Sequence, residues 1–285
     1  MWLRDGRAED DEVGERLRVP WWLALAALPL IFAASQLLGL LAQTTAASVL
    51  MAAGVPKPTP EHPAAVLSAM ATGSLLLCAC AIVVPRMLEL SPARLYRAWL
   101  APAPVFVAAS VGTFALGPLA DALMVAMAEH FPQATFDAIP RLHELARGMS
   151  FVLLWPFFAL LPGLSEELFF RGFIQSAFGR PSVAIGVSAV SFAVFHFDPH
   201  HAVGVFPLGL FLAWSAHRYG VLVAAVAHIV NNTVALATLK VAELDVGYGS
   251  DTVMPAWWVL VGLLVSLTCL GVLATYPASR GSSRS

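Results

Sequence analysis

Charged side chains are scarce in this sequence. Asp, Glu, Lys and Arg make up only 12% of its 285 residues, whereas 59% of the residues are hydrophobic. A soluble domain carries about 25% charged residues, so this chain has too few charges to cover a surface that faces water. The scarcity excludes an ordinary soluble protein and predicts that lipid is the main solvent of the folded chain.

Basic runs and paired cysteines are lacking as well. The net charge is −2 and basic residues do not cluster, so nucleic acid is not a predicted partner. The three cysteines, Cys78, Cys80 and Cys269, give no disulfide framework. Cys78 and Cys80 lie two apart in an apolar helix, where they point to different faces and make a poor metal pair.

Long apolar runs are what the sequence does contain. The first begins at Trp21 and is longer than the apolar part of a cleavable signal peptide, which spans about 7–15 residues. At about 20 residues a span, the chain has room for eight spans. We therefore predict an all-α polytopic membrane protein with about eight transmembrane helices. The predicted spans are residues 21–43, 64–85, 103–127, 149–164, 182–197, 202–217, 220–239 and 255–276.

Three of these runs are shorter than a full crossing. The fourth leads into residues 165–178, which also have a helical pattern, so we predict one long helix over 149–178. Pro162-Gly163 predicts a kink in that helix, and its charged second half is expected to pack inside the protein. The fifth and sixth runs are short enough to be partly re-entrant.

Arginine and lysine are unevenly distributed over the predicted loops, and this asymmetry orients a membrane protein. With the N-terminus in the cytoplasm, twelve of the 16 Lys and Arg residues lie on the inner side. Both termini are therefore predicted to be cytoplasmic. The inner set is Arg4, Arg7, Arg16, Arg18, Arg86, Arg94, Arg97, Arg171, Arg180, Arg218, Arg280 and Arg284, and the outer set is Lys57, Arg141, Arg147 and Lys240.

Two adjacent acidic residues interrupt an apolar helix. Glu166 and Glu167 lie inside the predicted helix 149–178, and an acidic residue at the centre of a membrane helix costs about 2.5–3.5 kcal/mol. Glu167 and Arg171 are four residues apart, so they share a helix face and can form an ion pair. Glu166 points about 100° away from that face and is predicted to face a cavity. A purely structural ion pair is the alternative for Glu167 and Arg171.

Two other helices carry polar residues at a comparable depth. His196 lies near the end of the fifth run, where a lone histidine is more often a packing residue. His228 and Asn232 are four residues apart on one face of the seventh run; hydrogen bonding between helices is the alternative to catalysis there. At 1.5 Å per residue, His228, Glu166 and His196 lie about 12, 18 and 21 Å into their helices. In an apolar core about 30 Å thick, these positions predict one hydrated cavity.

Three short motifs together carry a resemblance to a known family. Glu166-Glu167-Leu-Phe-Phe-Arg171 fits the pattern EExxxR, Phe192 with His196 fits FxxxH, and His228 with Asn232 fits HxxxN. In this order, on successive helices, they resemble the CPBP family (CAAX protease and bacteriocin-processing, or Abi) of intramembrane peptidases, which includes the type II CAAX prenyl endopeptidases. The resemblance covers about residues 149–240, whereas the first 148 residues are similar only as a set of membrane helices.

The resemblance implies an eight-helix fold that encloses a hydrated catalytic cavity, and endopeptidase activity. Glu166 would be the general base that takes a proton from the attacking water, and His196 would hold that water or share the proton. His228 and Asn232 would donate hydrogen bonds to the oxyanion, a contribution of about 3–4 kcal/mol per donor. The implied organisation is a cytoplasmic segment 1–20, N-terminal transmembrane helices 21–148, a catalytic core 149–240, and a last helix with a cytoplasmic tail 241–285.

The supporting residues and the cofactor also follow from the resemblance. Glu167 and Arg171 would orient Glu166, and Phe192 would pack behind His196. Members of the family are often described as metalloproteases, so Glu166, His196 and His228 are a candidate zinc set of the His₂Glu type. A metal-free glutamate peptidase is the other mechanism that the resemblance implies.

Other peptidase plans find no support in the sequence. His143-Glu144 is followed by Arg147 rather than by a second histidine, so the HExxH zinc motif is absent. Ser165 does not lie in a GxSxG elbow. His200-His201 follows a predicted break between helices and is interpreted as an exposed turn rather than as a second metal site.

Two other functions compete with a peptidase. A transporter would show inverted repeats and paired broken helices, and neither is evident. A catalytically inactive immunity or adaptor protein of the same fold would not need the full set of Glu166, His196, His228 and Asn232. The expected partner is a membrane-embedded or membrane-anchored protein substrate in the lipid bilayer. Frequent alanine suggests a bacterial inner-membrane protein, for which C-terminal tails or sorting signals are better candidate substrates than prenylated proteins.

Overall fold

The computed structural model describes residues 18–56, 59, 62–91, 95–96, 101–132, 144–240 and 254–277. Within these ranges the chain is helical and contains no β-strand. Most of the predicted segment 1–20, the Lys57 loop, His143, the loop around Gly247 and the tail after Pro277 lie outside the described residues. The helices are α2 (Trp21–Ala52), α3 (Pro63–Met87), α5 (Ala103–Phe114), α6 (Gly117–His130), α8 (Phe151–Trp155), η2 (Pro156–Leu160), α9 (Leu161–Glu166), η3 (Glu167–Ile174), α10 (Pro181–Phe195), α11 (Pro199–Tyr219), α12 (Val221–Lys240) and α13 (Ala256–Thr275).

Six helical stretches of the described chain are long and apolar enough to cross a membrane. They are Trp21–Ala52, Pro63–Met87, Ala103–His130, Phe151–Ile174, Val221–Lys240 and Ala256–Thr275. The prediction of an all-α, multi-pass membrane protein is therefore confirmed, but the count of about eight spans is not. The two remaining predicted spans correspond to α10, which has only 15 residues, and α11, which has 21 residues and many buried side chains. Protein rather than lipid surrounds much of α11, so its sequence need not be as apolar as a lipid-facing span.

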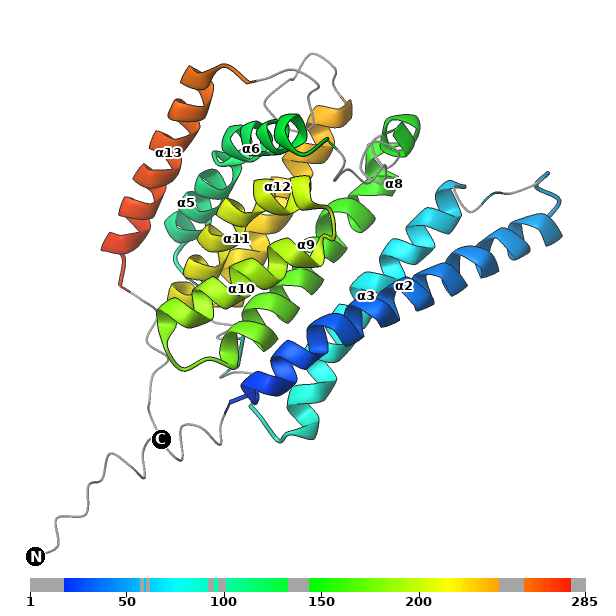
Figure 1. Cartoon of the computed structure of the whole chain (residues 1–285), viewed down its shortest axis with the longest axis horizontal. Coiled ribbons are helices and arrows are strands. Elements are labelled where there is room, and N and C mark those ends of the chain that lie inside the picture. The colour runs from blue at the N-terminus through cyan, green and yellow to red at the C-terminus, as the bar shows by residue number, and fades with distance from the viewer. Residues whose placement is uncertain are drawn as a thin grey trace, which may run out of the picture.

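The helices form a bundle with α11 and α12 near its middle (Figure 1). α11 packs against α6 and α10, and α12 packs against α5 and the stretch from η2 to η3. α2 and α3 run side by side as a hairpin along one flank, and α13 covers α5 on the opposite flank (Figure 1). The stretch α9–η3 therefore lies beside both of the other helices predicted to carry the site, with α10 against η3 and α12 against α9 and η3.

Residues Phe151–Ile174 form one helical stretch, but its irregularities differ from the predicted kink. Pro162-Gly163 lies within the regular α9, while wider π-helical turns occur before it, at η2, and after it, at η3. A proline ring clashes with the carbonyl one turn earlier, and the widened turn at η2 accommodates this clash without a break at Pro162 itself. η3 begins at Glu167, directly after Glu166, and π-helical turns of this kind are frequent at functional sites.

A group of buried aromatic rings fixes η3 against its neighbours. Phe169, Phe170 and Phe173 are fully buried and pack with residues of α2, α3 and α10. The ring of Phe170 makes edge-to-face contacts with Phe192 at 5.5 Å and Phe195 at 5.4 Å between centroids, a favoured geometry for aromatic pairs. The apolar face of η3 thus secures the helix, while its other face carries Glu167 and Arg171 into the bundle.

Positive charge gathers at one end of the bundle. α2 begins and α13 ends at this same end (Figure 1). Arg18 precedes α2, Arg86 lies in the last turn of α3, and Arg180 precedes α10. Arg218 donates to the carbonyl oxygens of Ala274 and Tyr276, each at 2.8 Å, at the end of α13. At the opposite end, Lys240 donates to the Arg147 carbonyl oxygen at 3.0 Å.

Candidate active site

Glu166 and Glu167 occupy the junction of α9 and η3 and have different surroundings. The side chain of Glu167 has no exposed surface, whereas that of Glu166 is 21% exposed. The predicted division, with one carboxylate held inside the protein and the other partly accessible, is what the structure shows. Glu166 is therefore the carboxylate that can meet a water molecule or a substrate.

The ion pair predicted between Glu167 and Arg171 is confirmed. Arg171 Nη1 lies 2.9 Å from Glu167 Oε1, and neither side chain has exposed surface. Arg171 Nη2 also donates to the Gly209 carbonyl oxygen of α11 at 3.3 Å, and the guanidinium carbon lies 4.3 Å from the centre of the Phe192 ring of α10. The pair thus connects η3 to two further helices, and its burial makes the loss of either partner expensive.

His228 of α12 contacts both carboxylates. Its Nδ1 lies 2.8 Å from Glu167 Oε1, and its Nε2 lies 3.9 Å from Glu166 Oε2. An ionised carboxylate can only accept hydrogen bonds, so Nδ1 donates to Glu167. This bond fixes the ring orientation and turns Nε2 toward Glu166.

A glycine allows α9 and α12 to come this close. A Cβ added at Gly163 would lie 2.7 Å from Ile229 Cγ1 and 3.0 Å from the Ile229 backbone nitrogen. Ile229 is the neighbour of His228, so a larger residue at position 163 would push the histidine away from the acidic pair. Because Gly163 has no side chain, α9 and α12 can pack closely enough for Glu166 and His228 to approach each other.

Phe192 packs between the two histidines of the predicted site. Its ring lies 4.9 Å from the His196 ring and 5.7 Å from the His228 ring, both edge to face. His196 follows α10, and its Nδ1 lies 2.8 Å from the Phe192 carbonyl oxygen. A carbonyl oxygen only accepts, so Nδ1 donates and Nε2 carries the lone pair. The predicted packing of Phe192 against His196 is confirmed, and the same ring also contacts His228.

Asn232 lies one turn beyond His228 on α12 and is partly exposed. Asn231, which is buried, donates from Nδ2 to the Asn232 side-chain oxygen at 3.3 Å. With its oxygen engaged in this way, Asn232 presents its own amide group as a hydrogen-bond donor. Asn232 therefore joins the site through its position on the His228 face rather than through a contact with the carboxylates.

The interpretation of His200-His201 as an exposed turn is wrong. Both residues belong to the first turn of α11, where the Asp198 side chain accepts hydrogen bonds from their backbone N–H groups at 2.9 and 3.1 Å. His200 is buried, and its Nε2 lies 3.0 Å from the Phe131 carbonyl oxygen of the segment that follows α6. The His201 ring lies 4.7 Å from that of His196. The Asp-Pro pair signalled a helix start rather than a loop.

Phe197, the residue after His196, has an unusual backbone. Its φ is 55°, the left-handed region that glycine normally occupies after a helix and that costs other residues about 1–2 kcal/mol. The Phe197 ring stacks on Phe32 of α2, with 3.4 Å between centroids and an interplanar angle of 13°.

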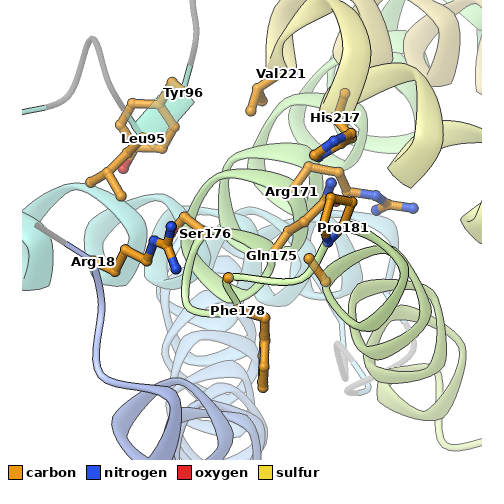
Figure 2. A pocket seen from close by; sticks show the side chains of 13 residues that line it. Arg18, Leu95, Tyr96, Arg171, Gln175, Ser176, Phe178, Pro181, His217 and Val221 are labelled. Carbon is orange, nitrogen blue, oxygen red and sulfur yellow. The ribbon is translucent and has the colours of Figure 1, made fainter. Parts of the chain in front are cut away.

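A cavity of about 270 Å³ opens at the positively charged end of the bundle (Figure 2). Its wall includes Arg18, Tyr96, Gln175 and His217, and its inner wall includes Arg171. Arg171 is the one residue that this cavity shares with the site described above. Burial, with a smaller effect of Cys80, raises the pKa of Tyr96 to about 12, so its hydroxyl remains a donor to the Ala81 carbonyl oxygen near neutral pH.

The candidate zinc set does not fit this geometry. Among the described residues, no three His, Cys, Asp or Glu side chains are grouped so that they could hold a metal ion. Glu166 and His228 approach each other, but His196 is connected to His228 through the Phe192 ring. The reaction below is therefore derived from the side chains alone.

Sequence reasoning missed three parts of this arrangement. The hydrogen bond between Glu167 and His228, the contact of His201 with His196, and the support of Asn232 by Asn231 were not predicted. Asn231 could have been noticed, because two adjacent asparagines in an apolar helix are costly unless both are hydrogen-bonded. The other two depend on how separate helices meet, for which the sequence contains no local signal.

Residues 148–234 match the family model described as type II CAAX prenyl endopeptidase Rce1-like. This part of the chain is similar to an Rce1-like domain. The match runs from just before α8 through most of α12 and includes every residue of the predicted site. It confirms the resemblance to CAAX-type intramembrane peptidases that EExxxR, FxxxH and HxxxN indicated. No curated protein and no solved structure matches the chain.

Proposed function

We propose that this protein is an intramembrane endopeptidase that hydrolyses peptide bonds of membrane-associated proteins. The observation that carries the proposal is the buried chain of contacts from Arg171 through Glu167 and His228 to Glu166. Such a chain inside an apolar bundle is costly, and it ends at one partly exposed carboxylate. The Rce1-like match over the same residues supports an assignment to peptide hydrolysis.

Glu166 is the general base in this proposal. Its carboxylate takes a proton from a water molecule as the water oxygen attacks the scissile carbonyl carbon. His196 contributes an unprotonated Nε2, since its Nδ1 donates to the Phe192 carbonyl oxygen, and this nitrogen accepts a second hydrogen bond from the same water. Glu166 then returns the proton to the leaving amine nitrogen as the carbon–nitrogen bond breaks.

His228 and Asn232 stabilise the oxyanion that forms on the carbonyl oxygen. Because Nδ1 donates to Glu167, donation from His228 Nε2 requires a proton on both ring nitrogens, and the ring lies between the carboxylates of Glu166 and Glu167. Arg171 holds Glu167 in place, so Glu167 and Arg171 act as positioning residues. Asn232 adds a neutral amide donor one helical turn away.

We also propose that the positively charged end of the bundle faces the cytoplasm. Arg18, Arg86, Arg180 and Arg218 lie at this end, as the positive-inside rule requires. The cavity of Figure 2 opens there as well, and Arg171 is part of its lining. The predicted location is the inner membrane of a bacterium, and proteins with cleavable C-terminal tails or sorting signals are the proposed substrates.

The decisive experiment compares wild type with Glu166→Gln in cells and in reconstituted membranes. Gln keeps the size and hydrogen-bonding shape of Glu but cannot accept the proton, so the variant is expected to assemble normally and to lose nearly all cleavage. C-terminal fragments of membrane proteins are quantified by mass spectrometry in both strains. Glu129→Gln, at an exposed position on α6, is the matched control and should preserve the wild-type fragments. Wild-type fragment levels with Glu166→Gln would reject the proposal.

A further inference from the structure

The cavity of Figure 2 has a wall that is basic and polar. Of the described residues that line it, none is acidic, whereas Arg18, Arg171 and His217 are basic. Its volume of about 270 Å³ lies at the lower edge of the range of about 300–1,000 Å³ that is usual for pockets that bind small molecules. The composition therefore suits an anion, and the size suits a small group rather than a length of polypeptide.

Arg18 supplies positive charge that the protein itself does not balance. Arg171 Nη1 lies 2.9 Å from Glu167 Oε1, so the charge of Arg171 is neutralised. Among the ion pairs of the described residues, none includes Arg18, and its side chain is exposed. The guanidinium lies against Gly179, since a Cβ added there would be 3.4 Å from Arg18 Cζ and closer still to Nη1. Figure 2 shows Arg18 and His217 on opposite sides of the cavity, so a ligand in it lies between two basic side chains.

The backbone around the cavity also favours negative charge. Carbonyl oxygens at the helix ends near it are already engaged, since Ile174 accepts from the Ala177 N–H at 3.1 Å and Ala216 accepts from the Gly220 N–H at 2.8 Å. By contrast, α10 begins at Pro181, which lines the cavity, and no side chain caps this helix. The first N–H groups of a helix have no partner within it, and together with the helix dipole they attract anions. The wall therefore offers donors rather than acceptors.

Two tryptophans place this cavity at the surface of the membrane. Trp21 and Trp22 begin α2, three and four residues after Arg18, and their side chains are exposed. Tryptophan rings at the ends of membrane helices lie at the level of the lipid headgroups. Arg18 therefore lies at the depth of the lipid phosphates, and basic pockets between helices at this depth bind phosphate-bearing headgroups.

We propose that the cavity binds one phosphate group, with Arg18 as its charged ligand and the start of α10 as its backbone donor. The phosphate belongs either to the headgroup of an anionic phospholipid or to inorganic phosphate in solution, and the site recognises what the two share. A zwitterionic headgroup suits the site less well, because its cationic end would lie near Arg18 and His217. The bound phosphate would connect the start of α2 to α10 and so raise the thermal midpoint. This binding does not depend on the proposed peptidase function.

The test measures binding to the purified full-length protein with three probes: phosphatidylglycerol, phosphatidylcholine and inorganic phosphate. Native mass spectrometry counts the bound lipids, and the thermal midpoint reports both lipid and phosphate. Arg18→Gln removes the charged ligand, and Arg86→Gln, at an exposed position in the last turn of α3, is the matched control for net charge. Gly179→Ala displaces the Arg18 guanidinium without a change in charge, and its control is Gly186→Ala, where an added Cβ would meet no atom within 4 Å.

Wild type is expected to bind one phosphate-bearing ligand, and Arg18→Gln and Gly179→Ala should each weaken that binding by about fivefold or more, while both controls resemble wild type. Retention of phosphatidylglycerol in preference to phosphatidylcholine would identify a lipid headgroup as the ligand. A higher thermal midpoint with inorganic phosphate, lost in Arg18→Gln, would identify phosphate from solution. Equal weakening by Arg18→Gln and Arg86→Gln would show a general attraction to the positively charged end and overturn the site. Wild-type binding by Arg18→Gln, or no saturable binding of any probe, would overturn it as well.

Discussion

Glu167 has the most demanding environment of any single residue in the site. It has no exposed surface, and one of its oxygens receives both the Arg171 guanidinium and His228 Nδ1. Its other oxygen, Oε2, is buried without a hydrogen-bond partner among the described residues. A carboxylate in this position is tolerated only because two donors share its charge. The residue that the motif pairs with Glu166 is thus the anchor that sets the orientation of His228.

Replacing Arg171 with Ala should lower both stability and activity. The substitution leaves a buried carboxylate without its charged partner, a loss that typically costs about 3–5 kcal/mol. Protein abundance in membranes and the thermal midpoint in detergent measure the effect. Arg180→Ala, at an exposed position before α10, is the control and should resemble wild type. Normal abundance of Arg171→Ala with full activity would show that the pair is dispensable.

Removal of the oxyanion donors should affect turnover more than substrate capture. His228→Ala and Asn232→Ala are each expected to lower kcat by about 10²–10³-fold with a small change in KM. Because Glu167 loses one of its donors in His228→Ala, that variant should also be less stable, whereas Asn232→Ala should not. Steady-state kinetics on reconstituted protein, with thermal midpoints on the same samples, separate the two effects.

Metal dependence is tested on the same reconstituted wild-type and variant proteins. The side-chain mechanism predicts that chelators leave wild-type cleavage intact and that purified protein carries no stoichiometric zinc. The candidate zinc set of Glu166, His196 and His228 would instead require inhibition by chelators, recovery with added zinc, and loss of bound metal in His228→Ala. Elemental analysis beside activity distinguishes the two mechanisms.

At the scale of residues, the sequence predicted a contact within one helix better than the contacts between helices. Glu167 and Arg171 lie on one helix, so four-residue spacing was sufficient to predict their ion pair. The contact of Glu167 with His228 joins positions 61 residues apart and depends on the approach of two helices. His200 shows the opposite error, since a local Asp-Pro signal was interpreted as a turn although the helix that follows buries the side chain.

Among the elements, α9 and α12 are held together closely beside the site. Gly163 of α9 packs against Ile229 of α12, one residue from His228 and three residues from Glu166. The π-helical turns at η2 and η3 lie on either side of this contact, and they set the directions in which the Glu166 and Glu167 side chains point. Apolar periodicity predicts that a helix spans 149–178 but not where its turns widen, because that depends on the neighbours against which the helix packs.

Gly163→Ala tests this constraint. The new methyl group would lie 2.7 Å from Ile229 Cγ1 and 3.0 Å from its backbone nitrogen, so α12 must shift, and such overpacking typically costs about 1–3 kcal/mol. We expect reduced cleavage with intact membrane assembly, because a small displacement of His228 is enough to misplace a donor. Gly186→Ala on α10, where the added methyl would meet no atom within 4 Å, should behave like wild type. Equal activity of both variants would mean that the close contact does not position the site.

For the molecule as a whole, the low charge content predicted the environment, and the pattern of apolar runs predicted most of the helices. The first run proved longer than predicted, since α2 extends over Trp21–Ala52. The number of spans was harder to predict, because α10 and α11 lie partly within protein and do not need the length or the apolarity of lipid-facing helices. A hydropathy pattern reports contact with lipid, so it is least informative for a helix such as α11 that lies largely within protein.

Orientation in the membrane is the prediction on which access to the site depends. Four arginines of the described chain lie at the end where α2 begins and α13 ends, and a helix pair such as α2 and α3 places the connection between them on the opposite side. A reporter fused after Ser285 should therefore be cytoplasmic, and one inserted at Pro58, between α2 and α3, should be external. The location of each position is measured with enzymatic reporters that are active on only one side of the membrane. The fusions are made in the Glu166→Gln variant, so that the protein cannot cleave its own reporter. A cytoplasmic reporter at Pro58 would contradict this orientation, and the cavity of Figure 2 would then open toward the outside of the cell.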